Sequence, residues 1–351
     1  MPRHNGTRGC TLLVPPQQGE QVLRQASGLS TAYRISAPAG YKQAVPQPLL
    51  LALHGWGMEH ASEAGWHRHG QERGYIVVTP TGYSEGGGFA ASWNGAGSVA
   101  SPGPLGPTCA QASSRGNCYP SCGACRDGCW WTTCRDSVGQ VASLLDEVMG
   151  RWCVARQQVY ATGLSNGGSL LFELARDPRT SGRIAAYLPT HGLPHAGFNS
   201  PPAHRPAALL GLWGLRDAFV PPRPNPLERW HPGRPNVSVD TWNGGGGWYY
   251  TVARAVTATW AAANGCQGAA PSQLDVSAFS AAPASLACVG WTRCSSGARV
   301  VECVHDGEHE PPWWRGDLFW DFARGAWPPR HRARQQARVP RRTSSVRHIR
   351  R

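Results

Sequence analysis

A serine between small residues, in the segment Gly163-Leu164-Ser165-Asn166-Gly167, is the part of this sequence whose residue types best fit a chemical step. A serine hydroxyl attacks a carbonyl carbon when a base takes its proton and preformed N–H donors hold the resulting oxyanion. Small neighbours permit the sharp strand-to-helix turn that exposes such a serine and aims the following amide at the same point. We therefore predict Ser165 as a nucleophile and the backbone N–H of Asn166 as one oxyanion donor.

Two residues farther along the chain have the types and positions expected of a base and its carboxylate. In one class of serine enzymes the acid follows the serine and the histidine comes last, each on a loop after a strand. Asp217 directly follows a predicted strand over 207–213, and His309 lies in a loop after a predicted strand over 298–304. We therefore predict Asp217 as the acid and His309 as the base. The alternatives, in poorer sequence contexts, are Asp240, Asp275 and His305.

A second oxyanion donor is expected from the loop after a strand over 49–54. The segment His54-Gly55-Trp56-Gly57 lies there, and its glycines allow the backbone to come close to the serine. We predict the N–H of Trp56 as this donor. His54 lies upstream of the serine, so we expect it to shape the loop rather than to act as the base.

These residues need a framework of strands and helices to hold them. Apolar runs over 49–54 and 75–79 are typical of strands buried on both faces of a parallel sheet. A strand over 157–162 leads into the serine turn, and apolar residues recur at helical spacing over 135–150. Because strands alternate with helices, we predict an α/β fold with a mostly parallel central sheet covered by helices on both faces. The other predicted elements are strands over 33–36, 207–213 and 298–304, helices over 168–176 and 249–264, and a loop over 221–247.

The sequence divides into three predicted segments. Residues 1–30 form a polar N-terminal extension, and residues 31–326 form the α/β domain. Within this domain, 81–134 is a long insertion rich in Gly, Pro, Ser and Cys, and it has no periodicity. Residues 327–351 are an Arg-rich tail that we expect to be disordered.

The positive charge is concentrated at the C-terminal end of the chain. The formal net charge is +13, and residues 322–351 contain ten arginines and no acidic residue, so the rest of the chain carries about +3. No recognisable nucleic-acid-binding fold precedes the tail, so we expect no nucleic-acid partner. No apolar run reaches the roughly 18 residues of a membrane span, so we expect no membrane association. The sequence predicts no oligomeric state.

The chain has twelve cysteines, and six of them lie in the insertion. This count favours disulfides and an oxidising compartment. Cys118, Cys122, Cys125 and Cys129 could also hold zinc, but a zinc site normally has two separated C-x-x-C pairs and only one is present. We therefore predict three disulfides in the insertion, no metal and no cofactor. Outside the insertion we predict that Cys294 pairs with Cys303 and Cys266 with Cys288.

Two N-glycosylation sequons, Asn5-Gly6-Thr7 and Asn236-Val237-Ser238, agree with secretion. The first residues, Met1-Pro2-Arg3-His4-Asn5, lack the apolar core of a signal peptide. We therefore expect an extracellular protein whose leader is missing from this sequence.

Several short segments between residues 30 and 325 match one known family, and residues 160–168 are the most specific of them. The others are Pro38-Ala39-Gly40-Tyr41, Leu53-His54-Gly55, Ser92-Trp93-Asn94, Asp217 with Val220-Pro221, Asn264-Gly265-Cys266 and Gly307-Glu308-His309. On these segments the chain resembles the extracellular α/β-hydrolase esterases described as polyhydroxybutyrate depolymerase-like and feruloyl esterase-like. The resemblance implies a catalytic triad at Ser165, Asp217 and His309, oxyanion donors at Trp56 and Asn166, and hydrolysis of a carboxylic ester.

The chain departs from this family in two ways. Trp56 stands where relatives often have Cys, so a disulfide there is excluded, and the Cys-rich insertion is absent from the simple bacterial forms. The resemblance implies a feruloyl or acetyl esterase acting on plant or algal polysaccharide. The alternatives are a polyhydroxyalkanoate depolymerase and a non-catalytic polysaccharide-binding protein on a hydrolase scaffold. Candidate substrate-binding residues among the sixteen tryptophans are Trp93, Trp130, Trp131, Trp313 and Trp314.

Overall fold

The computed structural model describes residues 6–110, 116–125, 127–202, 205–224, 236–242 and 247–327. Most of the predicted Arg-rich tail and Asn5 of the first sequon therefore lie outside the described residues. Trp327, which we placed at the start of the tail, is buried and donates its indole N–H to the carbonyl of Asp275 at 2.8 Å.

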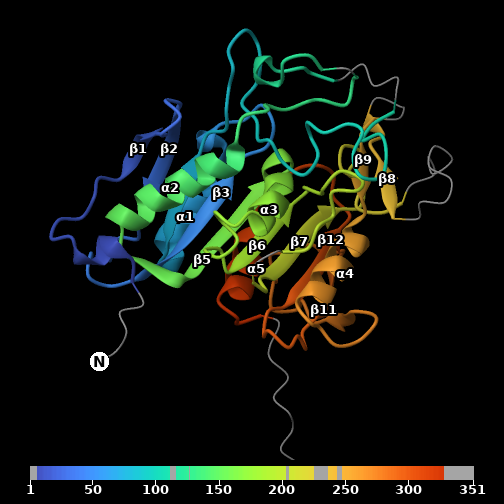
Figure 1. The fold of residues 1–351 in the computed structure, drawn as a ribbon. Helices are drawn as coiled ribbons and strands as arrows, with labels where there is room; N and C mark the ends of the chain where they lie inside the picture. The colour runs from blue at the N-terminus through green and yellow to red at the C-terminus, as the bar shows by residue number, and fades with distance from the viewer. Residues whose placement is uncertain are drawn as a thin grey trace, which may run out of the picture.

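The described residues form a ten-stranded sheet with the order β1-β2-β4-β3-β5-β6-β7-β12-β11-β10 (Figure 1). The six central strands, from β4 to β12, pair in parallel, and the strands at both edges pair antiparallel. The strands are β1 (Gly19–Arg24), β2 (Ser30–Ser36), β3 (Gln47–Leu53), β4 (Ile76–Pro80), β5 (Val154–Leu164), β6 (Ala186–Thr190), β7 (Ala208–Gly214), β10 (Ser272–Leu274), β11 (Ala287–Trp291) and β12 (Val300–His305).

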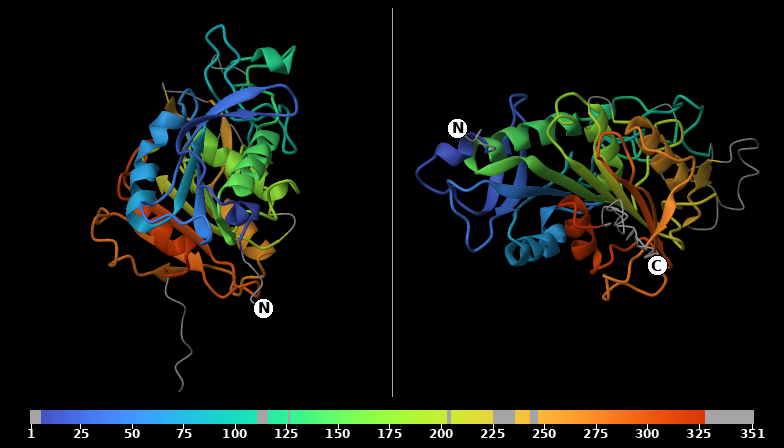
Figure 2. Two further views of the ribbon diagram at one scale, coloured as in Figure 1. Left: turned by 90° about the vertical axis from the view of Figure 1, so that its left-hand side faces the viewer. Right: turned by 90° about the horizontal axis from the view of Figure 1, so that it is seen from below.

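Helices cover both faces of this sheet (Figure 2). Side chains of β3 alternate between the two faces of the sheet. Leu49, Leu51 and Leu53 pack in one hydrophobic cluster, and Leu50 and Ala52 pack in the other. The first cluster contains side chains of α2, α3 and α4, and the second contains side chains of α1 and α5. The predicted mostly parallel sheet with helices on both faces is confirmed. The helices are α1 (Ala64–Arg73), α2 (Ser137–Arg151), α3 (Asn166–Arg176), α4 (Ala253–Ala263) and α5 (Arg315–Ala323).

The predicted N-terminal extension contributes to this sheet. Its residues 19–24 form β1, which pairs with β2, and its Cys10 forms a disulfide with Cys153 at the start of β5. The predicted helix over 249–264 is shorter than expected, because its first residues form β9 (Tyr249–Thr251), which pairs with β8 (Val237–Val239) in a separate two-stranded sheet. In the part of the chain described here, no helix has the length and apolar character of a bilayer span.

The insertion over 81–134 is held by disulfides rather than by regular structure. Its described residues contain one short 3-10 turn, Pro120–Cys122, and no α-helix. The predicted three disulfides are present, as Cys109–Cys129, Cys118–Cys125 and Cys122–Cys134. All twelve cysteines of the chain are paired.

Both disulfides that we predicted outside the insertion are wrong. Cys266 pairs with Cys294, and Cys288 pairs with Cys303. The reason is the register of β11 and β12, in which Cys288 lies directly opposite Cys303. Cys294 lies beyond this strand pair and faces Cys266 across an isolated bridge.

Candidate active site

Five neighbouring parallel strands end at the same edge of the sheet, and the loop after each of them supplies one part of the site. The loop after β3 supplies Trp56, β5 leads into Ser165, β6 into His191, β7 into Asp217, and β12 into His309. Because the carboxyl ends of parallel strands meet at one edge, residues far apart in the sequence converge there.

Ser165 lies at the turn between β5 and α3, with φ 51° and ψ −116°. This backbone conformation is strained for a residue with a side chain, and it persists only where the surrounding structure enforces it. The flanking glycines make the turn possible: a Cβ on Gly163 would lie 2.4 Å from the carbonyl of Gly167, and a Cβ on Gly167 would lie 2.5 Å from the carbonyl of His54. The predicted sharp strand-to-helix turn is therefore present, and it leaves Ser165 partly exposed.

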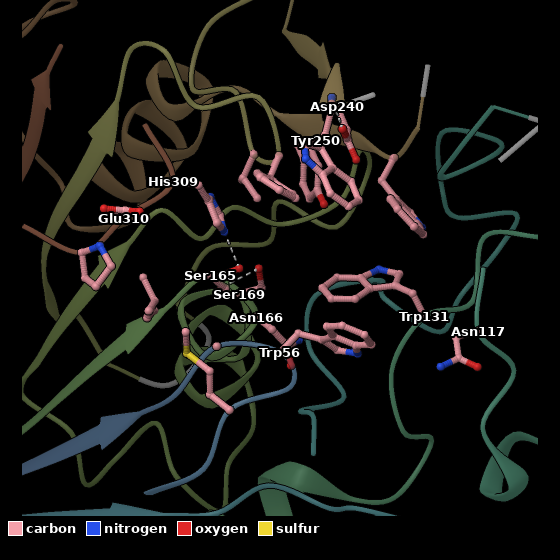
Figure 3. Close-up of a pocket in the computed structure, with 18 residues that line it drawn as sticks. Trp56, Asn117, Trp131, Ser165, Asn166, Ser169, Asp240, Tyr250, His309 and Glu310 are labelled. Carbon is pink, nitrogen blue, oxygen red and sulfur yellow. Dashed lines mark hydrogen bonds between the residues drawn. The ribbon is translucent and has the colours of Figure 1, made fainter. Parts of the chain in front are cut away.

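A chain of hydrogen bonds joins the three side chains that the sequence analysis singled out. Figure 3 shows the bond between Ser165 and His309. The Nε2 atom of His309 lies 2.8 Å from Oγ of Ser165, and its Nδ1 atom lies 2.7 Å from Oδ2 of Asp217. With the proton on Nδ1, His309 donates to the carboxylate and presents a free lone pair to the serine hydroxyl. This is the arrangement in which an imidazole can take a proton from a serine.

The carboxylate of Asp217 is buried and receives four hydrogen bonds. Its Oδ1 accepts the backbone N–H groups of Phe219 and Val220, both at 2.9 Å, and its Oδ2 lies within reach of two imidazoles. Burial alone would raise the pKa of Asp217, but the hydrogen bonds and charges of His191 and His309 outweigh it and hold the pKa well below its ordinary value. Asp217 is therefore ionised at neutral pH.

The second imidazole belongs to His191, a residue that the sequence analysis missed. It follows β6, has φ 51°, is fully buried, and places Nδ1 3.0 Å from Oδ2 of Asp217. Burial lowers the pKa of His191 even though Asp217 opposes this shift, so His191 is neutral and donates its Nδ1–H to the carboxylate. His191, Asp217 and His309 offer ligand atoms within 4.8 Å of one another, but both Nδ1 atoms are engaged with Asp217, so a metal ion there would compete with these hydrogen bonds.

The two predicted oxyanion donors lie next to the serine. In the described part of the chain, neither the backbone N–H of Trp56 nor that of Asn166 has a hydrogen-bond acceptor. The loop of Trp56 approaches closely, since a Cβ on Gly55 would lie 3.6 Å from Cβ of Ser165. Both amides are therefore available to a negatively charged oxygen at the serine.

A network of buried side chains fixes the position of these two amides. The Asn166 side chain accepts the N–H of Trp93 at 2.8 Å and donates to its carbonyl at 2.9 Å, and the Trp93 indole donates to the carbonyl of His54. The His54 ring bonds the carbonyl of Gly55 at 2.7 Å and accepts the N–H of Gly82 at 2.8 Å. As we expected, His54 shapes the loop that carries Trp56.

A cavity of about 530 Å³ opens above Ser165. Six aromatic side chains contribute to its walls, and Figure 3 shows Trp131 and Glu310 on opposite sides of Ser165. Asn117, Asp240 and Glu310 also line it and add polar groups to those of the site itself. The aromatic side chains that line it are Trp56, Trp131, Phe219, Trp242, Trp248 and Tyr250.

Comparison with known proteins gives the fold. No protein-family model and no curated protein matches the sequence. Among solved structures, the chain is similar to an acetyl xylan esterase from Aspergillus awamori, with a TM-score of 0.51 and 13% identity over 87% of this chain and 98% of that chain. At this identity the likeness shows the fold alone. The chain has the α/β-hydrolase fold.

Two other solved structures are less similar to this chain, and no conclusion is based on them. A thermostable esterase matches with a TM-score of 0.39 and 15% identity, over 57% of this chain and 48% of that chain, so this chain spans about half the length of that protein. An esterase from Thermogutta terrifontis matches with a TM-score of 0.37 and 12% identity, over 59% of this chain and 75% of that chain.

Within the α/β-hydrolase fold, the five predicted substrate-binding tryptophans have different positions. Trp131 lines the cavity, and its indole N–H bonds Nε2 of His195 at 3.0 Å. Trp93 is fully buried beneath the serine turn and cannot touch a ligand in the cavity. Trp130, Trp313 and Trp314 do not line the cavity either, and the last two line a separate hollow on the α1 side of the sheet.

The alternative acids and base lie elsewhere in this α/β-hydrolase fold. Asp275 is exposed and accepts the N–H of Ser277. Asp240 lines the cavity, where its Oδ1 accepts the N–H of Trp242. His305 is buried at the end of β12, where its Nδ1 accepts the N–H of Gly307. The structure brings Asp217 and His309 next to Ser165 instead.

Proposed function

We propose that the protein is a serine carboxylic ester hydrolase in which Ser165, His309 and Asp217 act as nucleophile, base and orienting acid. The observation that carries this proposal is the hydrogen-bond chain from Oγ of Ser165 through His309 to Asp217, at 2.8 and 2.7 Å, on a strained strand-to-helix turn. The same arrangement of side chains performs acyl transfer on several unrelated folds.

The first half of the proposed reaction forms an acyl-enzyme. Oγ of Ser165 attacks the ester carbonyl carbon while Nε2 of His309 takes the hydroxyl proton. The N–H groups of Trp56 and Asn166 hold the oxyanion, and losing one such donor typically costs about 10²–10³-fold in kcat. The tetrahedral intermediate then collapses, and His309 returns the proton to the departing alkoxide.

The second half releases the acid. A water molecule gives a proton to Nε2 of His309 and attacks the acyl carbonyl, and the same two amides hold the second oxyanion. Collapse transfers the proton back to Oγ of Ser165 and restores the enzyme. Asp217 stabilises the imidazolium of His309 in both halves.

For the substrate, we propose esters of aromatic or short acids with polysaccharide hydroxyls, of the feruloyl or acetyl type. The aromatic walls of the cavity support this, because they can enclose a planar acyl group. One of the solved structures that the chain resembles in fold is an acetyl xylan esterase, which makes acetylated xylan a substrate to test. The six disulfides support an extracellular or other oxidising location.

The proposal is tested by hydrolysis of a short-chain p-nitrophenyl ester. We expect Ser165→Ala to lose about 10⁴-fold or more in kcat, because the members of a triad act as a unit. Ser143→Ala on α2 is the matched control, since its hydroxyl bonds only the carbonyl of Gly139 and should leave the rate unchanged. Equal rates for the unaltered protein and Ser165→Ala would favour a non-catalytic binding protein.

A substrate panel then decides the ester class. Methyl ferulate, acetylated xylan and polyhydroxybutyrate should be compared at equal enzyme concentration. We expect higher kcat/KM on methyl ferulate or acetylated xylan than on the polyester. Preference for polyhydroxybutyrate would contradict the polysaccharide-ester proposal and leave the serine hydrolase proposal in place.

A further inference from the structure

A second cavity, of about 400 Å³, lies beside the loop that carries His309. It is bounded by α1, by residues 278–282 and by the start of α5. Pro311 lines this cavity and also the cavity above Ser165, so the two spaces meet at the segment that follows the proposed base. The second cavity therefore adjoins the first at Pro311.

An exposed tryptophan is the most prominent apolar group here. The side chain of Trp313 is 83% exposed. The next most exposed tryptophans that line either cavity are Trp56, at 46%, and Trp242, at 42%. An indole exposed to water offers a flat apolar surface on which a ligand can pack. The ring faces of sugars, which carry aligned C–H groups, pack on such a surface.

A buried guanidinium with an unused donor lies in the same cavity. Arg315 is 12% exposed, bonds Oε2 of Glu63 at 3.2 Å, and stacks its guanidinium 5.2 Å from the ring centre of Trp66. Its Nη1 is buried and has no hydrogen-bond partner among the described residues. A buried donor without an acceptor costs free energy, so a ligand that supplies an acceptor gains by binding there.

The remaining polar groups of this cavity have both signs of charge. Arg68 and Glu72 are exposed on α1, and Asp317 on α5 is paired with Arg73 and His69. Three acidic and two basic side chains line the cavity in all, so it has no excess of positive charge that would favour an anion. An aliphatic polyester offers acceptors but no donors, so it cannot bond the exposed carboxylate of Glu72.

We propose that this second cavity binds the sugar units next to the esterified one, with Trp313 as the stacking platform and a neutral oligosaccharide as its ligand. The inference rests on the proposed function, because it assigns the alcohol portion of the ester to this side of Ser165. A polyhydroxylated neutral ligand supplies donors to Glu72, acceptors to Arg315, and an apolar face to the indole. The acyl group then lies on the other side of Ser165, against Trp131.

Kinetics on paired substrates test this assignment. We expect Trp313→Ala to raise KM about fivefold or more for an acetylated or feruloylated xylo-oligosaccharide, as expected for the loss of one aromatic stacking contact. The same variant should leave KM unchanged for methyl ferulate and p-nitrophenyl acetate, which do not reach Trp313. Trp242→Ala, a matched exposed tryptophan in the first cavity, should alter KM for the small aromatic ester as well.

Direct binding separates this inference from the proposed function. Ester-free xylohexaose should be titrated into Ser165→Ala and into the double variant Ser165→Ala/Trp313→Ala, with tryptophan fluorescence as the readout. We expect binding that weakens about fivefold or more when Trp313 is lost. Absence of xylohexaose binding, or binding that does not depend on Trp313, would overturn the inference even if p-nitrophenyl esters are hydrolysed. Trp313-dependent binding without any ester hydrolysis would keep the sugar site and overturn the proposed function.

Discussion

Each oxygen of the Asp217 carboxylate has two hydrogen-bond donors, and both donors to Oδ2 are histidines. His191 lies opposite His309 on this oxygen, at 3.0 Å against 2.7 Å. Each donor disperses part of the negative charge that stabilises the imidazolium of His309 during the proposed reaction. His191 is therefore a positioning residue, which holds the carboxylate in place and moderates its effect on the base.

Removal of His191 should change the pH dependence of hydrolysis. In His191→Leu, the carboxylate keeps more of its charge, so the protonated form of His309 becomes more stable. We expect the acid limb of the kcat/KM profile to move to higher pH, by about half a unit or more. The other titratable or charged groups that face the His191 ring, His305 on β12 and Arg315 paired with Glu63, are unchanged in this variant.

Two comparison variants separate this effect from a loss of stability. His191→Asn tolerates the left-handed backbone and keeps an N–H donor near the position of Nδ1, so its acid limb should stay near that of the unaltered protein. His67→Leu removes another buried imidazole, which bonds Ser36 and Thr79 rather than residues of the site. If His67→Leu moved the acid limb as much as His191→Leu, the positioning role would be wrong.

Asn166 contributes its side chain as well as its backbone amide. Asn166→Asp keeps the N–H but replaces the donor to the Trp93 carbonyl by a charged oxygen, which loosens the loop that carries Trp56. We expect kcat for a p-nitrophenyl ester to fall at least tenfold with KM little changed, and stability to fall by about 1–3 kcal/mol. Asn264→Asp, at an equally buried amide that bonds the carbonyl of Ala207, should cost similar stability without the loss of kcat.

At the scale of elements, the predictability of each strand depended on its own composition. The strands β3, β4 and β7 were predicted because they are continuous apolar runs, and β5 because it is rich in β-forming residues before the serine turn. The central strand β6 was missed, because it is short and contains Pro189, a residue that argues against a central strand. Without β6, nothing in the sequence marked His191 as the residue that follows a strand at the edge of the sheet where the site forms.

The local motifs predicted the residues around Ser165 better than the residues of the cavity. Ser165, Asp217 and His309 each follow a strand within a few residues, so sequence position alone places them on one edge of the sheet. The cavity walls depend on how irregular segments fold back. Trp130 and Trp131 are adjacent in sequence, but only the second reaches the cavity, and no sequence period distinguishes them.

The disulfide between Cys109 and Cys129 supports the aromatic wall of the cavity. The backbone of Cys109 forms an isolated antiparallel β-bridge with that of Trp248. The indole N–H of Trp248 donates to the carbonyl of Cys129 at 3.4 Å. We expect Cys109→Ser/Cys129→Ser to raise KM for methyl ferulate more than for p-nitrophenyl acetate, because the wall loses its fixed position. Cys266→Ser/Cys294→Ser, which removes a disulfide outside the insertion, should alter neither KM. Equal effects of the two variants would contradict this role.

At the scale of the whole molecule, buried neutral histidines make stability depend on pH. Burial lowers the pKa of each of four histidines to about 4, against about 6.5 when exposed. Between these values the unfolded chain binds protons that the folded chain does not, so the free energy of unfolding falls as the pH falls from about 7 to 4. Asp217, whose pKa is lowered, loses its own contribution only below the pKa of an unfolded aspartate. The four histidines are His54, His67, His195 and His305.

Urea unfolding at several pH values between 7 and 4.5 measures this dependence. We expect the free energy of unfolding of His67→Leu to depend less steeply on pH than that of the unaltered protein. The two slopes should differ by up to one bound proton, or about 1.4 kcal/mol per pH unit. An unchanged slope would mean that His67 is protonated in the folded state.

The six disulfides fall into two groups that share no member. Three join cysteines within the insertion over 81–134, and three join cysteines outside it. Neither group depends on a thiol from the other for its pairing. Recombination or protein engineering can therefore replace the whole insertion with one of different length and leave no unpaired thiol in the rest of the chain. Selection can then alter the wall above Ser165 while the disulfides outside the insertion are kept.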